Sequence, residues 1–266
     1  MSESSSHEFE AVLELAQRLA RQAGGIQRER YESDLIVETK SESIDLVTDV
    51  DRACEKLIVD TLAELRPRDA ILAEEGSGED IADAAWRWII DPLDGTTNYA
   101  HGYPRFCVSI GVEHDGVGVV GVVYDPMLDE MFCGIRGRGA TLNGRAIHVS
   151  SESDMSRAML ATGFAYDVHR SDDDNINHFA AIVKAARALR RDGSAALDLC
   201  YVASGRFDGF WELKLHAWDV AAGIIIVEEA GGRTSDFSGA ESCRTGRETV
   251  VSNTHLHDAI LEILRH

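Results

Sequence analysis

Residues 106–149 constrain the fold most strongly, because short apolar runs and tight-turn signals replace helical spacing there. Asp115-Gly116 and Asn143-Gly144 are typical of the two-residue turns that join antiparallel strands. The pattern therefore predicts an antiparallel sheet in the middle of the chain. GVGVVG at 116–121 also matches a dinucleotide-binding pattern, but that pattern requires a strand that ends where a helix begins. Here glycine and valine alternate directly after a turn, which indicates a strand.

Helical spacing of apolar residues occurs on both sides of this region. Helices are predicted at 9–23, 50–65, 176–189, 194–204 and 255–264, with another from about 219 to Gly231-Gly232. Strands are predicted at 70–73, 86–90, 158–162, 207–212 and 248–252. The apolar face of the 176–189 helix would comprise Ile176, Phe179, Ile182, Val183, Ala186 and Leu189. Such a mixture predicts a layered α/β or α+β architecture.

Composition narrows the class of protein. A chain of 266 residues with 44% hydrophobic residues can bury one large core, so we expect a single domain over 1–266; a subdomain boundary near residue 150 is the alternative. No run approaches the roughly 18 apolar residues of a membrane span, and the polar start MSESSSHEFE does not resemble a signal peptide. Five scattered cysteines without a C-x-x-C pair argue against a disulfide framework and a zinc site. We expect a cytoplasmic protein that has no membrane association.

The formal net charge of −20 disfavours direct nucleic-acid binding, because the surface would repel a phosphate backbone. An acidic site that handles an anionic substrate needs a cation between the two. Four groups of acidic residues lie at the edges of predicted elements and could converge on such a cation: AEEG at 73–76, DPLDGTT at 91–97, Asp51 in DLVTDVD and Asp219 in HAWDVAAG. Carboxylate oxygens, water and substrate phosphate are the usual ligands of Mg²⁺.

The stretch DPLDGTTNY at 91–99 follows the apolar run WRWII. Pro92 would stiffen the turn so that Asp91 and Asp94 face one pair of metal ions, and Gly95 would allow close approach of a ligand. The amides of Gly95 and Thr96 at a helix start would receive a phosphate, aided by the helix dipole.

Each acidic residue also has a structural interpretation. Asp91-Pro92 can simply be a turn, and Asp94 can cap a short helix. Glu74 and Glu75 can be loop charges. Asp51 and Asp219 can stabilise helix starts, while Trp218 is expected in the core and His216 as a packing residue.

Taken together, these motifs resemble the inositol monophosphatase family, within the lithium-sensitive, metal-dependent phosphatases that include fructose-1,6-bisphosphatases. The resemblance covers about residues 8–264. It rests on DLVTDVD at 45–51, Glu74-Glu75, WIIDPLDGTTNY at 88–99 and WDVAAGIIIVEEAGG at 218–232, with support from 137–144 and 193–212. It implies a five-layered αβαβα sandwich and a homodimer.

The resemblance also implies a ligand set for two or three Mg²⁺ ions, with Mn²⁺ as a substitute. Glu74, Asp91, Thr96 and the main-chain carbonyl of Leu93 would hold the first ion. Asp91 would bridge to a second ion, which Asp94 and Asp219 would also coordinate. Glu74 would coordinate a third, more weakly bound ion. Asp51 and the Thr96 hydroxyl would position and deprotonate the attacking water.

For the substrate, the resemblance implies that Gly95 and Thr96 hold the phosphate. The sugar or cyclitol hydroxyls would be lined by Asp94, Gly193, Ser194, Ala195 and Glu212. The implied reaction is direct hydrolysis of a myo-inositol monophosphate by metal-activated water, without a phosphoenzyme. Three departures from the usual family pattern bear on substrate preference and remove no ligand: Ala73 before the glutamates, Ser194 in place of a frequent Thr, and LHAWD at 215–219.

Two alternatives stay open at this point. The same chemistry could act on fructose-1,6-bisphosphate, histidinol phosphate or 3′-phosphoadenosine nucleotides, although Glu212 favours inositol. Alternatively, the chain could resemble the bacterial relatives that bind the transcription machinery. A complete ligand set argues against a purely structural role.

Overall fold

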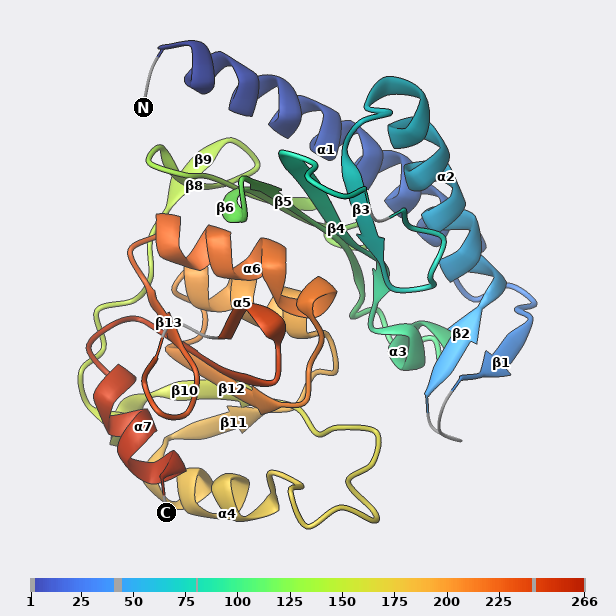
Figure 1. The fold of residues 1–266 in the computed structure, drawn as a ribbon. Helices are drawn as coiled ribbons and strands as arrows, with labels where there is room; N and C mark the ends of the chain where they lie inside the picture. Colours follow the sequence, from blue (N-terminus) through green and yellow to red (C-terminus); the bar gives the residue numbers. More distant parts are fainter. Residues whose placement is uncertain (1–2, 41–44, 80, 241–242, 266) are drawn as a thin grey trace.

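The fold is a stack of five layers in which helices and sheets alternate (Figure 1). The structure is a computed structural model that describes residues 3–40, 45–79, 81–240 and 243–265. The outer helices α1 (Glu3–Arg30) and α2 (Asp49–Leu65) cover a seven-stranded sheet. Helices α5 (Ala195–Ala203) and α6 (Ala217–Glu229) separate it from a five-stranded sheet, whose other face carries α4 (Ile176–Ala185) and α7 (His257–Leu264). The predicted αβαβα sandwich is therefore confirmed.

The seven-stranded sheet contains the antiparallel region predicted from 106–149. Its strands, in spatial order, are β3 (Ala70–Ala73), β4 (Trp86–Asp94), β5 (Cys107–His114), β6 (Val117–Asp125), β7 (Glu130–Ile135), β8 (Gly139–Leu142) and β9 (Arg145–Ile147). Only β3 and β4 run parallel; every later pair is antiparallel. The GVGVVG stretch lies at the start of β6, as its alternation indicates.

The five-stranded sheet has the order β11–β10–β12–β14–β13. Its strands are β10 (Met159–Thr162), β11 (Ala188–Arg190), β12 (Gly209–Leu213), β13 (Arg233–Ser235) and β14 (Glu248–Ser252). A separate hairpin, β1 (Val37–Thr39) and β2 (Leu46–Thr48), precedes α2. The chain passes between the large sheets over residues 148–158, and division into one or two domains stays a prediction.

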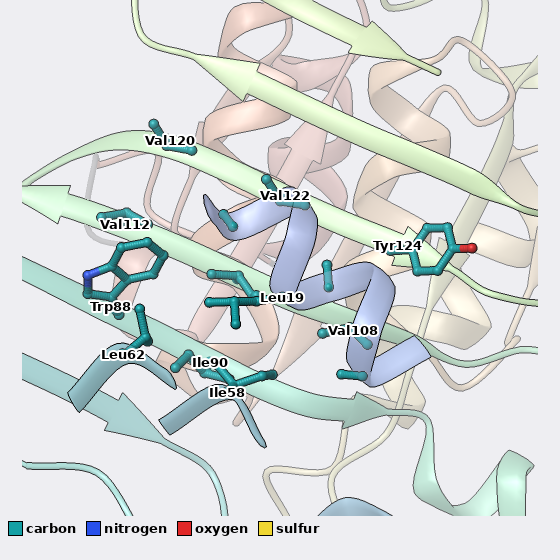
Figure 2. Packing of buried hydrophobic residues seen from close by; sticks show 14 of the residues in the cluster. Leu19, Ile58, Leu62, Trp88, Ile90, Val108, Val112, Val120, Val122 and Tyr124 are labelled. Atoms are coloured by element: carbon teal, nitrogen blue, oxygen red, sulfur yellow. The ribbon is translucent and has the colours of Figure 1, made fainter. Parts of the chain in front are cut away.

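The outer core forms where α1 and α2 pack on the seven-stranded sheet (Figure 2). Leu19 from α1 and Ile58 from α2 are fully buried against Trp88 and Ile90 of β4. Burial of a large aliphatic side chain contributes about 1.5–3 kcal/mol, so this layer fixes β4 firmly. The strand that ends in Asp91 and Asp94 is therefore a rigid support.

On the opposite face, two glycines allow α6 to lie directly on the sheet. A Cβ added at Gly121 would lie 2.4 Å from the carbonyl oxygen of Ala222, and one added at Gly111 would lie 2.7 Å from the Cβ of Ala221. Such distances exclude any side chain larger than hydrogen at these positions. Glycine in the GVGVVG stretch therefore serves helix packing, and the close approach sets the position of Asp219 at the start of α6.

The predicted helix at 176–189 is wrong at its end. Helix α4 stops at Ala185, because Ala186 turns to extended backbone and residues 188–190 pair with β10 as strand β11. Its apolar face is also narrower than predicted, since Ile176 and Val183 are 49% and 48% exposed. The helix covers only the margin of the sheet, where it packs against α7.

The hairpin β1–β2 and strand β13 were not predicted, because three-residue strands carry little periodicity. No helix in the described ranges is long and apolar enough to cross a membrane.

A buried histidine in the C-terminal layer makes folding stability depend on pH. The ring nitrogens of His257 lie 2.8 Å from the hydroxyls of Ser235 and Ser252, and burial lowers the pKa of His257 to about 4. The unfolded chain binds a proton at this residue below about pH 6.5, whereas the folded protein does not. The contribution of His257 to stability is therefore complete above pH 6.5 and falls as pH decreases toward 4.

We expect this residue to contribute about 2 kcal/mol of pH-dependent stability between pH 7.5 and 5. Urea unfolding of wild type, His257→Gln and the exposed-site control His255→Gln at both pH values measures it. The contribution is the part of the pH dependence that His257→Gln lacks and the control retains. Equal pH dependence in all three proteins would contradict the assignment.

Candidate active site

A bulge at the end of β4 brings two predicted ligands together. Side chains three residues apart on a regular strand point to opposite faces of the sheet. Here the register against β5 shifts, so that Asp91 pairs with Ser109 and Asp94 pairs with Cys107. Bulges of this kind re-aim a side chain. The carboxylates of Asp91, Asp94 and Asp219 consequently offer oxygen atoms that all lie within 4.8 Å of one another.

Each carboxylate of this cluster is oriented by a neighbouring donor. The amide of Leu93 donates to Asp91 over 2.9 Å, and the amide of His216 donates to Asp219 over 2.7 Å. Asp94 accepts from the hydroxyl of Ser194 at 2.6 Å and from the amide of Ala196 at 2.8 Å. Asp219 is the third residue of helix α6. Its carboxylate therefore both stabilises the start of the helix and belongs to the cluster.

The cluster is electrostatically suited to a cation. Burial raises the pKa of Asp91, and the charges of Glu74, Asp94 and Asp219 raise it further. Burial likewise raises the pKa of Asp94 and of Asp219. Buried carboxylates that repel one another are stabilised by a bound divalent ion, and an all-oxygen donor set is typical of Mg²⁺ or Mn²⁺. The residues present therefore fit a divalent metal centre.

Glu74 reaches the same region from the turn after β3. Its Oε1 accepts from the ammonium group of Lys40 at 2.9 Å, and Lys40 also contacts Glu75 at 2.5 Å. Glu55 of α2 fixes this turn, since its carboxylate accepts from the amides of Glu75 and Ser77 at 2.7 and 2.9 Å. Lys40 and Glu55 were not predicted as site residues. Neither belongs to a spacing pattern, and only the fold places them beside the glutamates.

Asp51 and Thr96 form a buried pair next to the cluster. The hydroxyl of Thr96 lies 2.8 Å from Asp51 Oδ1 and 3.1 Å from the carbonyl oxygen of Leu93. The other oxygen of Asp51 accepts from the amide of Thr48 at 2.8 Å and from its hydroxyl. Burial raises the pKa of Asp51. Helix-start stabilisation and a hydrogen bond toward the site are thus both present at this residue.

Glycine at position 95 is required by the backbone itself, while the predicted close approach of a ligand stays a prediction. Its φ is +99°, and an added Cβ would lie 2.8 Å from the carbonyl oxygen of Arg105. The helix that follows, α3 (Thr96–Ala100), has only five residues. Its dipole is therefore small, so phosphate recognition here would depend mainly on the local amides.

A cavity of about 230 Å³ opens beside the cluster. Among the predicted site residues, it is lined by Glu74, Asp94, Gly95, Thr96, Gly193, Ser194, Ala195, Glu212 and Asp219. Asp51, Asp91 and Leu93 lie outside this lining; Asp51 and Leu93 contact Thr96, and Asp91 belongs to the carboxylate cluster. The structure therefore places nine of the predicted site residues around one cavity and the other three next to residues that line it, while their roles stay predictions.

Glu212 faces this cavity from β12. Burial raises its pKa well above the usual range. Space for the carboxylate exists because residue 163 is glycine: an added Cβ there would lie 2.2 Å from Glu212 Oε1. Trp218 is half-buried, lines the cavity and stacks on the exposed ring of His216, with ring centroids 4.7 Å apart. The prediction of Trp218 as a core residue was wrong, because the start of α6 faces the cavity.

Comparison with known proteins assigns the family. A family model described as the inositol monophosphatase family matches residues 8–266. The chain belongs to the inositol monophosphatase family. Nus factor SuhB of Pseudomonas aeruginosa is 43% identical, with 97% of each chain covered. Inositol monophosphatase 2 of Solanum lycopersicum is 42% identical over 96% of this chain and 98% of its own. The solved inositol monophosphatase from Anabaena (Nostoc) sp. PCC 7120 is 40% identical, with a TM-score of 0.87 over 97% of this chain and 96% of its own.

Proposed function

We propose that the protein is a metal-dependent phosphomonoesterase that hydrolyses myo-inositol monophosphate to inositol and phosphate. The observation that carries the proposal is the convergence of Asp91, Asp94 and Asp219 at the wall of a cavity in a member of the inositol monophosphatase family. We assign Mg²⁺ to this cluster, with Glu74, the Leu93 carbonyl and the Thr96 hydroxyl as further ligands. The four carboxylates of Asp91, Asp94, Asp219 and Glu74 could hold two or three Mg²⁺ ions, and Mn²⁺ could replace Mg²⁺.

The chain's own residues would handle the proton of the attacking water. Because Thr96 donates to Asp51 in the buried pair, a proton taken at the Thr96 hydroxyl can be held on the Asp51 carboxylate. Thr48 keeps that carboxylate oriented. Bound Mg²⁺ would act as a Lewis acid and lower the pKa of water.

Substrate recognition would come from the remaining lining residues. We assign the phosphate to the amides of Gly95 and Thr96. Asp94, Glu212 and the segment Gly193, Ser194 and Ala195 would accept from or donate to the ring hydroxyls. A carboxylate such as Glu212 accepts hydrogen bonds from neighbouring hydroxyls, which favours a polyol ring over a less hydroxylated substrate.

A panel of phosphate-release assays tests the substrate assignment. Inositol 1-phosphate, fructose-1,6-bisphosphate, histidinol phosphate and 3′-phosphoadenosine nucleotides are compared at equal Mg²⁺ concentration. We expect the highest kcat/KM for inositol 1-phosphate. A higher value for any of the other esters would overturn the assignment of inositol while leaving the metal chemistry in place.

The 43% identity to a Nus factor SuhB favours a second candidate function, association with the transcription machinery. The acidity of the chain argues for contact through protein rather than through nucleic acid. Homodimer formation, lithium sensitivity and a cytoplasmic location remain proposals of the same kind. Pull-down of purified RNA polymerase and its elongation factors, with wild-type and metal-site variants, distinguishes a scaffold role from catalysis.

A further inference from the structure

The side-chain amide of Asn98 lies at a junction of three separate chain segments. Its Nδ2 lies 2.7 Å from the carbonyl oxygen of Arg105, 2.8 Å from that of Asp192 and 3.2 Å from that of Gly193. Asn98 belongs to α3, two residues after Thr96. One amide group therefore connects the segment of the metal ligands with the segment of the predicted substrate residues, which lies about 95 positions further along the chain.

The same three segments are in contact without intervening side chains. A Cβ added at Gly95 would lie 2.8 Å from the Arg105 carbonyl oxygen and 3.3 Å from that of Gly193. One added at Gly193, whose φ is +77°, would lie 3.2 Å from the amide atoms of Asn98. Close packing keeps these segments from moving toward one another, and the hydrogen bonds of Asn98 keep them from moving apart.

The metal side of this junction is held by other contacts as well. The amide of Tyr99 donates to the Gly95 carbonyl at 3.0 Å, and Thr96 contacts Asp51. The Asp192–Gly193 side has fewer contacts. The Arg105 guanidinium lies 3.9 Å from the Asp192 carboxylate and 3.0 Å from that of Asp198. Asp94 holds the residues that follow, through the hydroxyl of Ser194 at 2.6 Å and the amide of Ala196 at 2.8 Å, whereas the carbonyls of Asp192 and Gly193 are held by Asn98. Loss of the Asn98 amide should thus move residues 192–193 more than residues 94–96.

We propose that Asn98 is a positioning residue that sets Gly193, the start of the segment 193–195, at the distance required to bind the ring hydroxyls of the substrate. The proposal rests on the proposed function, because it assumes that this segment contacts the ring. It assigns to Asn98 a role in substrate selectivity rather than in phosphate hydrolysis itself. Misplacement of a positioning group by about 1 Å can cost a large factor in rate, so the effect is measurable.

Asn98→Asp and Asn98→Leu test the proposal, since both have nearly the shape of asparagine and neither donates to the carbonyls. We expect KM for inositol 1-phosphate to rise about tenfold, with a small change in kcat. For p-nitrophenyl phosphate, which has no ring hydroxyls, kcat/KM should change less than about twofold. The ratio of the two kcat/KM values therefore falls about tenfold. Mn²⁺ affinity, measured by the paramagnetic resonance of free Mn²⁺, should stay unchanged.

Tyr31→Phe is the matched control, because it removes a hydrogen bond to Gly102 just beyond α3 without contact to residues 192–193. It should lower stability without changing the ratio of kcat/KM for inositol 1-phosphate to kcat/KM for p-nitrophenyl phosphate. If the Asn98 variants do not fold, Gly193→Ala presses a methyl group on the same amide and should lower the ratio alike. An unchanged ratio in folded variants would overturn the positioning role. Absence of inositol 1-phosphate hydrolysis in the wild type would instead overturn the proposed function.

Discussion

Asp94→Asn should abolish phosphate release while leaving the protein folded. The substitution removes one negative charge from the cluster with Asp91 and Asp219 and also changes a residue that faces the cavity. The new amide oxygen can still accept from Ser194 and Ala196, so the local structure should persist. Loss of one preorganised hydrogen-bond donor typically costs about 100-fold to 1000-fold in kcat, and loss of a charged metal ligand should cost at least about 1000-fold in kcat/KM.

The same variant should be more stable than wild type in the absence of metal, by about 1 kcal/mol, because a buried repulsive charge is gone. Asp115→Asn is the matched control, since it makes the same change in an exposed turn between β5 and β6. It should leave both activity and stability near wild type. Normal hydrolysis by Asp94→Asn would show that Asp94 is not part of the metal centre.

Mg²⁺ should raise the free energy of unfolding of the wild type by about 3 kcal/mol at a concentration 100 times its dissociation constant. The ion binds the folded cluster and relieves the repulsion that raises the pKa of Asp91 and Asp219. In the metal-free protein these raised pKa values mean that the folded state binds more protons than the unfolded state. Its stability therefore falls as pH rises from about 4 through the raised values.

The gain from Mg²⁺ should be larger at pH 8 than at pH 5, because protonated carboxylates bind the ion weakly. Urea unfolding with Mg²⁺ and with a chelator, at both pH values, measures this difference. Asp94→Asn provides the comparison, since the gain should shrink markedly in that variant. If Mg²⁺ stabilised the wild type and Asp94→Asn equally, the ion would bind elsewhere on the acidic surface and the assignment would be wrong.

Much of the fold was predictable because its elements carry strong periodicity. The Asp-Gly and Asn-Gly turns located the antiparallel sheet, and the αβαβα layering followed from the family resemblance and was confirmed. Strand β11 was missed because Leu189 continues the helical spacing of α4, whereas pairing with β10 decides its conformation. Pairing between distant segments leaves no local signal in one sequence.

In the candidate site, too, local motifs were predictable and contacts between distant segments were not. Asp91 and Asp94 were identified from a motif, but the bulge that turns both toward Asp219 could not be read from spacing. Lys40 beside Glu74 and the contact of Asn98 with Asp192 could not be predicted, because the partners of both residues lie far along the chain. Trp218 was misplaced because an aromatic residue at a helix start can face either a core or a cavity.

Crystals soaked with Mn²⁺ and inositol 1-phosphate test whether the acidic cluster is the metal centre of a phosphatase, through the anomalous scattering of manganese. We expect at least two anomalous peaks among Asp91, Asp94, Asp219 and Glu74, with the phosphate of the ester next to Gly95 and Thr96. No anomalous peak at this cluster, with manganese bound only at other carboxylates, would contradict it.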